Sequence, residues 1–309
     1  MEGVVLKSTG SWYMVKTPDG LSYNCKIKGR FKTKDIKSTN PIAVGDLVSF
    51  VLQKDEEIGI ITDIHFRRNY LIRKATKLSS QTHILAANID YAVLIVSLAF
   101  PRTSSGFIDR FLLAAEAYHI PAILVFNKID LHDEKMKIQL KEWMQIYEDI
   151  GYSCFALSAK TGAGVADFKA LIRGKTNLFS GHSGVGKSKL INVLQPGLTL
   201  KTSSVSISNQ KGTHTTTFAE MHPLDIGGYL IDTPGIKGFG LVDFETSEVP
   251  GYFPEMRKMA VYCKFNNCTH THEPGCAVRE AVNNGVISVS RYNNYIEIIN
   301  DDYFSENPF

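Results

Sequence analysis

The stretch "SGHSGVGKSKL", residues 180–190, limits the possible folds more than any other part of the sequence. Glycines at 181 and 186, followed by Lys187 and Ser188, give the G-x-x-x-x-G-K-S spacing of a phosphate-binding loop. Glycines there let several backbone N–H groups face phosphate oxygens, beside the positive end of a helix. The loop follows a predicted strand, "TNLFSG", and precedes a predicted helix, "KSKLINVL". This setting predicts a nucleotide-binding α/β domain, although a glycine-rich turn with a capping serine has the same residues.

Three more motifs each follow an apolar strand. "NKID" (127–130) follows "PAILVF", "SAK" (158–160) follows "YSCFAL", and "DTPG" (232–235) follows "YLI". The carboxyl ends of parallel strands share one edge of a sheet, where ligands bind in open α/β folds. A carboxylate at Asp130 accepts hydrogen bonds from two donors on the edge of guanine. Adenine would leave it unpaired, a mismatch that such sites reject by ~10⁴-fold or more. The motifs together predict a GTP site.

Each motif has an expected role. Asn127 hydrogen-bonds the base and the loop, the Lys128 stem lies along the base, and the Ala159 N–H meets the guanine oxygen. Lys187 reaches the β- and γ-phosphates and Ser188 ligates Mg²⁺. The expected GTP-binding residues are Asn127, Lys128, Ile129, Asp130, Ser158, Ala159, Lys160, Ser180, Gly181, His182, Ser183, Gly184, Val185, Gly186, Lys187 and Ser188.

Magnesium and the γ-phosphate have a second set of expected partners. Asp232 would hold Mg²⁺ through water, and the Gly235 N–H would meet the γ-phosphate. In "KGTHTTTF", residues 211–218, one threonine is expected to ligate Mg²⁺ when GTP is bound. The candidates are Thr215, Thr216 and Thr217.

The order of the motifs is unusual. Ordinary GTPases begin with the phosphate loop and then run DxxG, NKxD and SAK. Here the order is NKID, SAK, phosphate loop and DTPG, which predicts a circularly permuted GTPase domain, since a fold with neighbouring termini tolerates such a cut. The segment after DTPG then runs into a cysteine-rich region instead of the next strand, so movement on hydrolysis is expected to reach that region.

Catalysis is expected to be slow in the isolated chain. Many GTPases carry a water-positioning glutamine just after DxxG, whereas this sequence has Ile236. His214 is a candidate for positioning the attacking water, and a surface histidine in a loop is the alternative. We therefore expect turnover to depend on a partner.

The N-terminal part is predicted to be a small β-barrel. Residues 1–68 contain about five short strands with turn signals such as Pro18-Asp19-Gly20, and a basic loop, "KIKGRFKTKDIK". Residues 1–80 hold 14 Lys/Arg against 8 Asp/Glu, a net charge of +6. The combination suits an OB-type barrel that binds nucleic acid, and the alternatives are a structural cap and a solvated basic surface.

The remaining pattern gives the other domains. Strands alternate with helices in the middle of the chain. One helix, "DEKMKIQLKEWMQIYED", is predicted to pack its apolar face against the core, and the residues of that face are Met136, Leu140, Trp143, Met144 and Tyr147. Two helices are predicted near the C-terminus, "CAVREAVNNG" and "SVSRYNNYIEIIND". The predicted boundaries are 1–70 for the barrel, 71–244 for the α/β GTPase domain and 245–309 for a helical zinc-binding domain.

A cysteine cluster predicts a metal site. "CKFNNCTHTHEPGC" contains Cys263, Cys268 and Cys276, with His270 or His272 as the fourth ligand. Thiolates and an imidazole suit a closed tetrahedral Zn²⁺ site. No apolar run of about 18 residues or signal-like N-terminus is present, so we expect a cytoplasmic chain without membrane contact, in which clustered cysteines indicate metal rather than disulfides.

The combination resembles the bacterial small ribosomal subunit biogenesis GTPase family, RsgA. The barrel, the permuted motif order, the K-G-x-H-T-T-T segment and the spacing C-x₄-C-x-H-x₅-C carry the resemblance, which covers essentially the whole chain. It implies one structural zinc on Cys263, Cys268, His270 and Cys276, binding of ribosomal RNA on the immature small subunit, and hydrolysis of GTP to GDP stimulated by that subunit late in maturation. A monomer is expected.

Two other classes of protein share some of these features. A metabolic kinase would use the phosphate loop but would not need NKID, and nucleotide specificity separates it from a GTPase. A pure RNA-binding scaffold would explain the barrel and the cysteines but not four guanine-nucleotide motifs, and any turnover excludes it.

Overall fold

The computed structural model describes residues 1–27, 41–53, 58–76, 79–198, 219–232 and 246–300. The chain divides into two compact units, which are described separately. The first comprises Met1–Tyr91, Lys169–Phe179 and Ile191–Ile236, and the second comprises Ala92–Phe168, Ser180–Leu190 and Lys237–Phe309.

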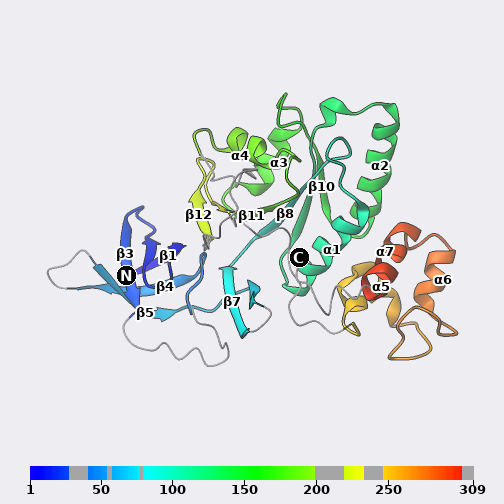
Figure 1. Ribbon diagram of the computed structural model, residues 1–309, viewed down its shortest axis with the longest axis horizontal. Helices are drawn as coiled ribbons and strands as arrows, with labels where there is room; N and C mark the ends of the chain where they lie inside the picture. The colour runs from blue at the N-terminus through cyan, green and yellow to red at the C-terminus, as the bar shows by residue number, and fades with distance from the viewer. Residues whose placement is uncertain (28–40, 54–57, 77–78, 199–218, 233–245, 301–309) are drawn as a thin grey trace, which may run out of the picture. The chain divides into compact units, whose positions relative to one another are not determined.

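The N-terminal strands of the first unit close into a five-stranded barrel. They are β1 (Glu2–Ser8), β2 (Tyr13–Lys16), β3 (Ser22–Ile27), β4 (Leu47–Leu52) and β5 (Ile58–Ile64). Around the barrel β1 pairs with β2, β2 with β3, β3 with β5 in parallel, β5 with β4, and β4 with β1 again (Figure 1). Alternate apolar side chains fill the interior, including Val5, Tyr13, Val15, Cys25, Val48, Phe50 and Ile61. The predicted OB-type barrel is confirmed.

Five more strands belong to the first unit. β6 (Tyr70–Thr76) and β7 (Ser79–Ala87) form an antiparallel hairpin, which the sequence did not predict. β11 (Thr176–Ser180) pairs in parallel with β13 (Tyr229–Asp232), as expected for strands that lead to nucleotide motifs. β12 (Glu220–Pro223) pairs antiparallel with β13, and its Glu220 lies opposite Lys7 of β1. β12 was not predicted, because four residues with a histidine and a proline carry little strand signal.

The second unit has a parallel core of β8 (Tyr91–Val96), β9 (Ala122–Phe126) and β10 (Ser153–Ala156), with β9 in the middle. β8 is an almost continuous buried apolar run, as parallel strands covered on both faces are. The connecting helices are α1 (Ser105–Ala117) and α2 (Glu134–Asp149), and α3 (Val165–Ile172) follows β10. α4 (Lys187–Leu194) begins directly after the phosphate loop, as predicted.

Helix α2 differs from the expectation. Its predicted core stripe is only half-buried, and Tyr147 alone of the five residues is fully buried. Ile138 on the same helix is 60% exposed. The apolar period correctly predicted a helix, but nothing among the described residues covers its N-terminal half as a core would.

The C-terminal part of the second unit is a helical cluster around its own apolar core (Figure 1). It contains η2 (Val249–Tyr252), α5 (Pro254–Ala260), α6 (Ala277–Asn283) and α7 (Val289–Asn300). α6 and α7 are the two predicted helices. The core includes Val249, Phe253, Met256, Val278, Ile287, Tyr295 and Ile298.

A buried ionic network joins α7 to α1 and α5. Arg291, 2% exposed, donates to Asp109 at 2.7 Å and to both oxygens of Glu255 at 2.7 and 3.1 Å. Tyr147 and Asn294 also donate to Asp109. Burial alone would lower the pKa of Arg291, but Asp109 and Glu255 outweigh it and raise the pKa above its usual value. The network therefore holds a charged, fully paired arginine between three helices.

No helix among the described residues is long and apolar enough to span a membrane.

Candidate functional site

Asn127 connects the three described nucleotide motifs. It follows β9, is 2% exposed, and its backbone N–H donates to the Val96 carbonyl at the end of β8. Its side-chain nitrogen donates to the Val185 carbonyl of the phosphate loop at 2.8 Å, and its side-chain oxygen accepts from the Ala159 N–H at 3.0 Å. NKID, SAK and the phosphate loop therefore meet at one buried amide, as the shared sheet edge predicted.

The phosphate loop needs glycine at this meeting point. Gly186 has φ +98°, and a Cβ there would lie 2.2 Å from the side-chain nitrogen of Asn127. Any larger residue would break the bond from Asn127 to Val185. The Gly186 carbonyl in turn accepts from the Leu190 N–H, which starts α4. Glycine at 186 thus lets the Asn127 side chain approach the backbone of the loop just before the helix begins.

Lys128 lies across the phosphate loop. It has φ 69°, and its Nζ donates to the carbonyls of Phe100 and Gly184, each at 2.6 Å. The loop after β8 therefore supports the NKID lysine, a contact that the sequence did not predict. The side chain of Pro101 in that loop also lies near Gly184, 3.2 Å from where a Cβ would stand.

Asp130 is held by the SAK motif. The buried Ser158 hydroxyl donates to Asp130 at 2.6 Å, and the Lys160 ammonium is 4.0 Å from its other oxygen. The Ser158 hydrogen bond outweighs the desolvation and holds the pKa of Asp130 below its usual value. The same hydroxyl oxygen accepts from the N–H groups of Lys160 and Thr161. Asp130 is thus an oriented, ionised acceptor.

His182 fixes the outer side of the phosphate loop. Its ring lies on the ring of Phe107 in α1, with centroids 3.7 Å apart. Burial against its neighbours lowers the pKa of His182, so the imidazole is neutral at pH 7. Its partner Phe107 could not be identified from the loop motif, because the motif says nothing about which helix lies behind it.

The remaining predicted residues divide into two groups. Lys187 and Ser188 are half-buried at the first turn of α4. His214, Thr215, Thr216, Thr217, Gly235 and Ile236, and the side chain of Asp232, lie outside the described residues.

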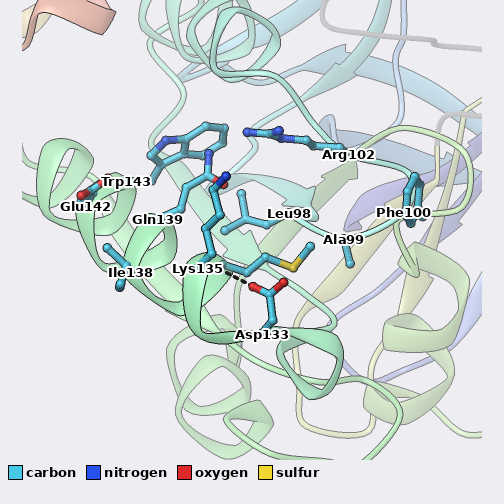
Figure 2. Close-up of a pocket in the computed structure, with 11 residues that line it drawn as sticks. Leu98, Ala99, Phe100, Arg102, Asp133, Lys135, Ile138, Gln139, Glu142 and Trp143 are labelled. Atoms are coloured by element: carbon cyan, nitrogen blue, oxygen red, sulfur yellow. Dashed lines mark hydrogen bonds between the residues drawn. The ribbon is translucent and has the colours of Figure 1, made fainter.

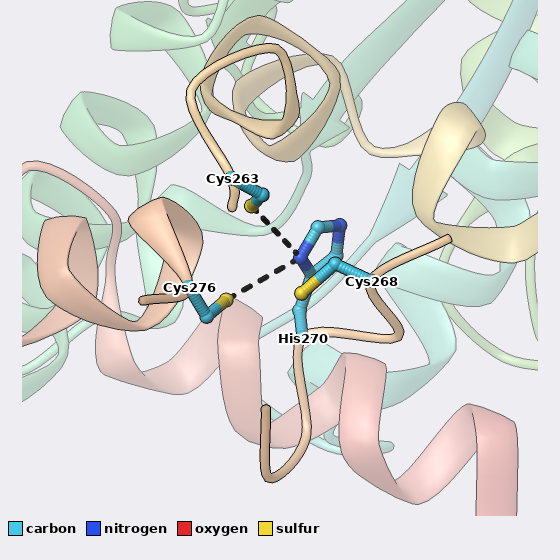
Figure 3. Close-up of side chains that lie close together, drawn as sticks. All are labelled: Cys263, Cys268, His270 and Cys276. Carbon is cyan, nitrogen blue, oxygen red and sulfur yellow. Dashed lines mark hydrogen bonds between the residues drawn. The ribbon is translucent and has the colours of Figure 1, made fainter. Parts of the chain in front are cut away.

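The cysteine cluster gathers four ligand atoms (Figure 3). The thiols of Cys263, Cys268 and Cys276 and the Nδ1 of His270 all lie within 4.8 Å of one another. Nδ1 is 3.6 Å from the Cys263 sulfur and 3.5 Å from the Cys276 sulfur. A tetrahedron with Zn–S bonds of ~2.3 Å and Zn–N bonds of ~2.0–2.1 Å has S···N edges of about 3.6 Å. These residues therefore fit a four-coordinate zinc.

The structure distinguishes the two candidate histidines. His270 is 2% exposed and has φ 59°, which turns its ring toward the sulfurs. His272 is exposed, and its Nδ1 contacts the Thr271 hydroxyl instead. His270 thus completes the cluster.

Glu273 shapes the turn that carries His270. Its carboxylate accepts from the N–H groups of Thr269, Thr271 and His272 at 2.7, 3.1 and 3.2 Å. The residue was missed because the metal spacing does not require it; an acidic residue just after a run of turn residues was the available signal. Two tyrosines of α7 fasten the same turn, with Tyr292 donating to the His270 carbonyl and Tyr295 to that of Thr269.

The Cys268 thiol needs a nearby cation to ionise at pH 7. Burial raises the pKa of the Cys268 thiol to about 12, so at pH 7 it is neutral without a metal. Ligation requires the thiolate, so a bound zinc would displace that proton and bring the sulfurs together as ligands.

Comparison with known proteins identifies the family. A family model described as the RsgA GTPase matches residues 64–242, and one described as the RsgA N-terminal domain matches residues 2–61. "Small ribosomal subunit biogenesis GTPase RsgA 2" of Bacteroides thetaiotaomicron is 54% identical over 301 residues, 97% of each chain. "Small ribosomal subunit biogenesis GTPase RsgA" of Flavobacterium psychrophilum is 51% identical over 304 residues, which are 98% of this chain and 93% of the relative.

Two solved structures agree. The crystal structure of YjeQ from Thermotoga maritima has a TM-score of 0.79 and 34% identity and covers 96% of each chain. The structure of YloQ, described as a circularly permuted GTPase, has a TM-score of 0.78 and 30% identity, covering 100% of this chain and 96% of its own. The permuted order of motifs is therefore shared with solved relatives. With both family models matched and relatives more than half identical over nearly its full length, the chain belongs to the RsgA GTPase family.

Proposed function

We propose that this chain binds GTP through NKID, SAK and the phosphate loop, and hydrolyses it to GDP while bound to the small ribosomal subunit during late maturation. The observation that carries the proposal is the pair of hydrogen bonds by which the Asn127 side chain donates to the Val185 carbonyl and accepts from the Ala159 N–H, which connects the guanine and phosphate motifs. The names of the relatives support the choice of the small subunit as partner. The barrel and its basic charge support ribosomal RNA as the surface it binds.

Guanine selection is assigned to Asp130. Its carboxylate, ionised and oriented by Ser158, accepts from the two donors on the edge of guanine. The Lys128 side chain, anchored on two carbonyls, supports the base. The Ala159 N–H, which was expected to meet the guanine oxygen, donates here to the Asn127 side-chain oxygen at 3.0 Å.

Phosphate binding is assigned to the loop 180–188. Its N–H groups and the first turn of α4 face the phosphates, and Lys187 neutralises the transferred group. Ser188 and Asp232 would hold Mg²⁺, with one of Thr215, Thr216 and Thr217 added when GTP is bound. When bound, Mg²⁺ supplies positive charge that stabilises the developing negative charge on the phosphates.

The zinc assigned to the cysteine cluster is structural. Three thiolates and one imidazole fill all four coordination positions of a tetrahedral zinc and leave none open for a substrate. The ion would therefore stabilise the turn 263–276. We propose domain boundaries at 1–70, 71–244 and 245–309, a cytoplasmic location and a monomeric chain as parts of the same account.

The test compares nucleotide turnover with and without purified small subunits. GTP should be hydrolysed slowly by the chain alone, because Ile236 stands where an orienting glutamine is common, and faster with subunits. ATP should not be hydrolysed, and Lys187→Ala should remove both rates. ATP turnover equal to that of GTP, or no response to subunits, would contradict the proposal.

His214 is the proposed water-positioning residue. His214→Ala should keep GTP affinity and lose most of the stimulation by subunits. Stimulation equal to that of the unmodified chain would make His214 an ordinary loop residue while leaving the assignment of GTP hydrolysis intact.

A further inference from the structure

A cavity of about 620 Å³ opens between the loop after β8 and the N-terminal half of α2 (Figure 2). Leu98 and Ala99 form its buried floor, and Trp143 of α2 is half-buried along its wall. It lies beside the half-buried stripe of α2 that the sequence predicted to be core. The described residues place no side chain inside it.

Four charged side chains line this cavity: Arg102 and Lys135 are cationic, and Asp133 and Glu142 are anionic. The side chains of Arg102 and Lys135 are exposed, and neither forms a hydrogen bond or ion pair within the described part of the chain. Figure 2 shows both extending toward the Trp143 side of the cavity, where the Gln139 amide also lies. The Asp133 carboxylate is already engaged, because it caps α2 by accepting from the Met136 N–H at 2.7 Å. Glu142 is the remaining acidic residue.

A planar aromatic ligand with a nearby anionic group fits this lining. An indole face stacks on a planar ring, an amide hydrogen-bonds its edge, and two free cations take a phosphate. An unpaired RNA nucleotide has all three features. An acidic peptide would use the cations but has no general need for an indole beside an amide.

We propose that the cavity lined by Arg102, Lys135, Gln139 and Trp143 binds an unpaired nucleotide of RNA. The base stacks on Trp143, Gln139 meets the base edge, and Arg102 and Lys135 hold the phosphate. This inference rests on the proposed function, since the RNA is that of the small subunit.

The cavity shares a wall with the guanine site. The loop that supplies Leu98, Ala99, Phe100 and Arg102 also supports Lys128, because the Phe100 carbonyl accepts from its Nζ at 2.6 Å. Phe100 itself is 89% exposed at the rim. A nucleotide in the cavity therefore contacts the loop that positions the lysine of NKID.

The chain offers a direct optical test, since it contains two tryptophans, Trp12 and Trp143. In Trp12→Phe the emission comes from Trp143 alone. Titration with an eight-residue oligoadenylate RNA, and separately with purified small subunits, should quench that emission, because a stacked base quenches an indole. Arg102→Ala in the same background should weaken the oligoadenylate titration about 5- to 50-fold, and Lys141→Ala, which removes a charge from α2 outside the cavity lining, should change it less than about 2-fold.

A second variant controls for damage to α2. Because both variants lack the Trp143 reporter, their binding is followed by the anisotropy of a fluorescently labelled oligoadenylate. Trp143→Phe retains a ring and should bind the RNA more tightly than Trp143→Leu, while both keep the GTP turnover of the isolated chain. Equal binding by the two variants would overturn the stacking role.

The outcomes separate this inference from the proposed function. If Trp12→Phe cosediments with small subunits and is stimulated by them but Trp143 emission is unchanged, the cavity proposal fails and the proposed function stands. Quenching by subunits but not by RNA would assign the cavity to a protein partner and also overturn it. If neither this variant nor the unmodified chain binds subunits, the proposed function itself fails.

Discussion

The nucleotide loops and the cysteine cluster belong to the same compact unit, yet different forces hold them. Asn127, Ser158 and Lys128 make hydrogen bonds of 2.6–3.0 Å that connect the guanine and phosphate motifs without any ligand. In the cluster the Nδ1 of His270 lies 3.6 and 3.5 Å from two of the sulfurs, the spacing of groups around an ion rather than of strong hydrogen bonds. The chain alone connects the first site. In the second site Glu273, Tyr292 and Tyr295 hold the turn, and the proposed metal would join the four ligand atoms.

The largest expected effect follows from removing one ligand of the cluster. Cys268→Ser should release the metal and unfold the turn 263–276, because zinc binding contributes roughly 10 kcal/mol or more to the folding of small zinc modules. Metal analysis and urea unfolding measure the change. His272→Ala is the matched control and should keep one metal per chain, since His272 lies outside the cluster. Loss of the metal in the control instead would mean that the fourth ligand is misassigned.

Loss of the Asn127 amide should be the next largest effect. Asn127→Ala leaves the Val185 carbonyl and the Ala159 N–H without their buried partner, at a cost of about 1–3 kcal/mol for each group. Stability and GTP affinity should both fall, while the metal content stays unchanged. A variant with normal GTP affinity would show that the loops do not need this connection.

Guanine affinity should fall by a smaller amount in Asp130→Asn. Replacing the carboxylate removes a charge-assisted acceptor and costs about 2–3 kcal/mol, or roughly 30- to 150-fold in affinity. Xanthine carries an oxygen where guanine has its amino group, so the variant amide should recover affinity for xanthosine triphosphate. Calorimetry with both nucleotides checks the pair, and equal weakening toward both would argue that Asp130 does not face the base edge.

The smallest expected effect concerns His182. Its pKa is lowered in the folded chain, so the unfolded chain takes up a proton at higher pH than the folded one. The stabilisation is complete above about pH 6.5, the usual pKa of histidine, and is lost as the pH falls toward the lowered value. His182→Gln should therefore lose less stability between about pH 7.5 and about pH 5 than the parent chain. An identical fall in melting temperature would remove His182 from the pH response.

The two sites also differ in how far the sequence predicted them. The motifs predicted where the strands end and that NKID, SAK and the phosphate loop lie together. Each motif follows an apolar strand, and the carboxyl ends of parallel strands lie at the same edge of the sheet. The same reasoning could not find the supporting contacts of Phe100 and Phe107, which depend on how loops and helices pack.

Charge and burial were the other limits. The sequence analysis did not single out Asp109, Glu255 and Arg291, and their burial follows from three helices meeting, which no local pattern contains. The stripe of α2 was assigned to the core because period 3.6 marks an apolar face but not what covers it. The barrel, set by local alternation, was predicted correctly, and the short spacing of the cysteines and histidine predicted the cluster of side chains that the structure brings together.

We expect the chain itself to organise the guanine site, and the proposed metal to be needed in addition to the chain's own hydrogen bonds to hold the turn 263–276. The most direct measurement is GDP affinity before and after zinc is removed by a chelator, with hydrogen exchange followed in both sites. We predict that GDP affinity changes less than about 3-fold, well under the tenfold that 1.4 kcal/mol represents, while amides of 263–276 lose protection. Loss of GDP binding on metal removal, or unchanged protection of the turn, would contradict the account.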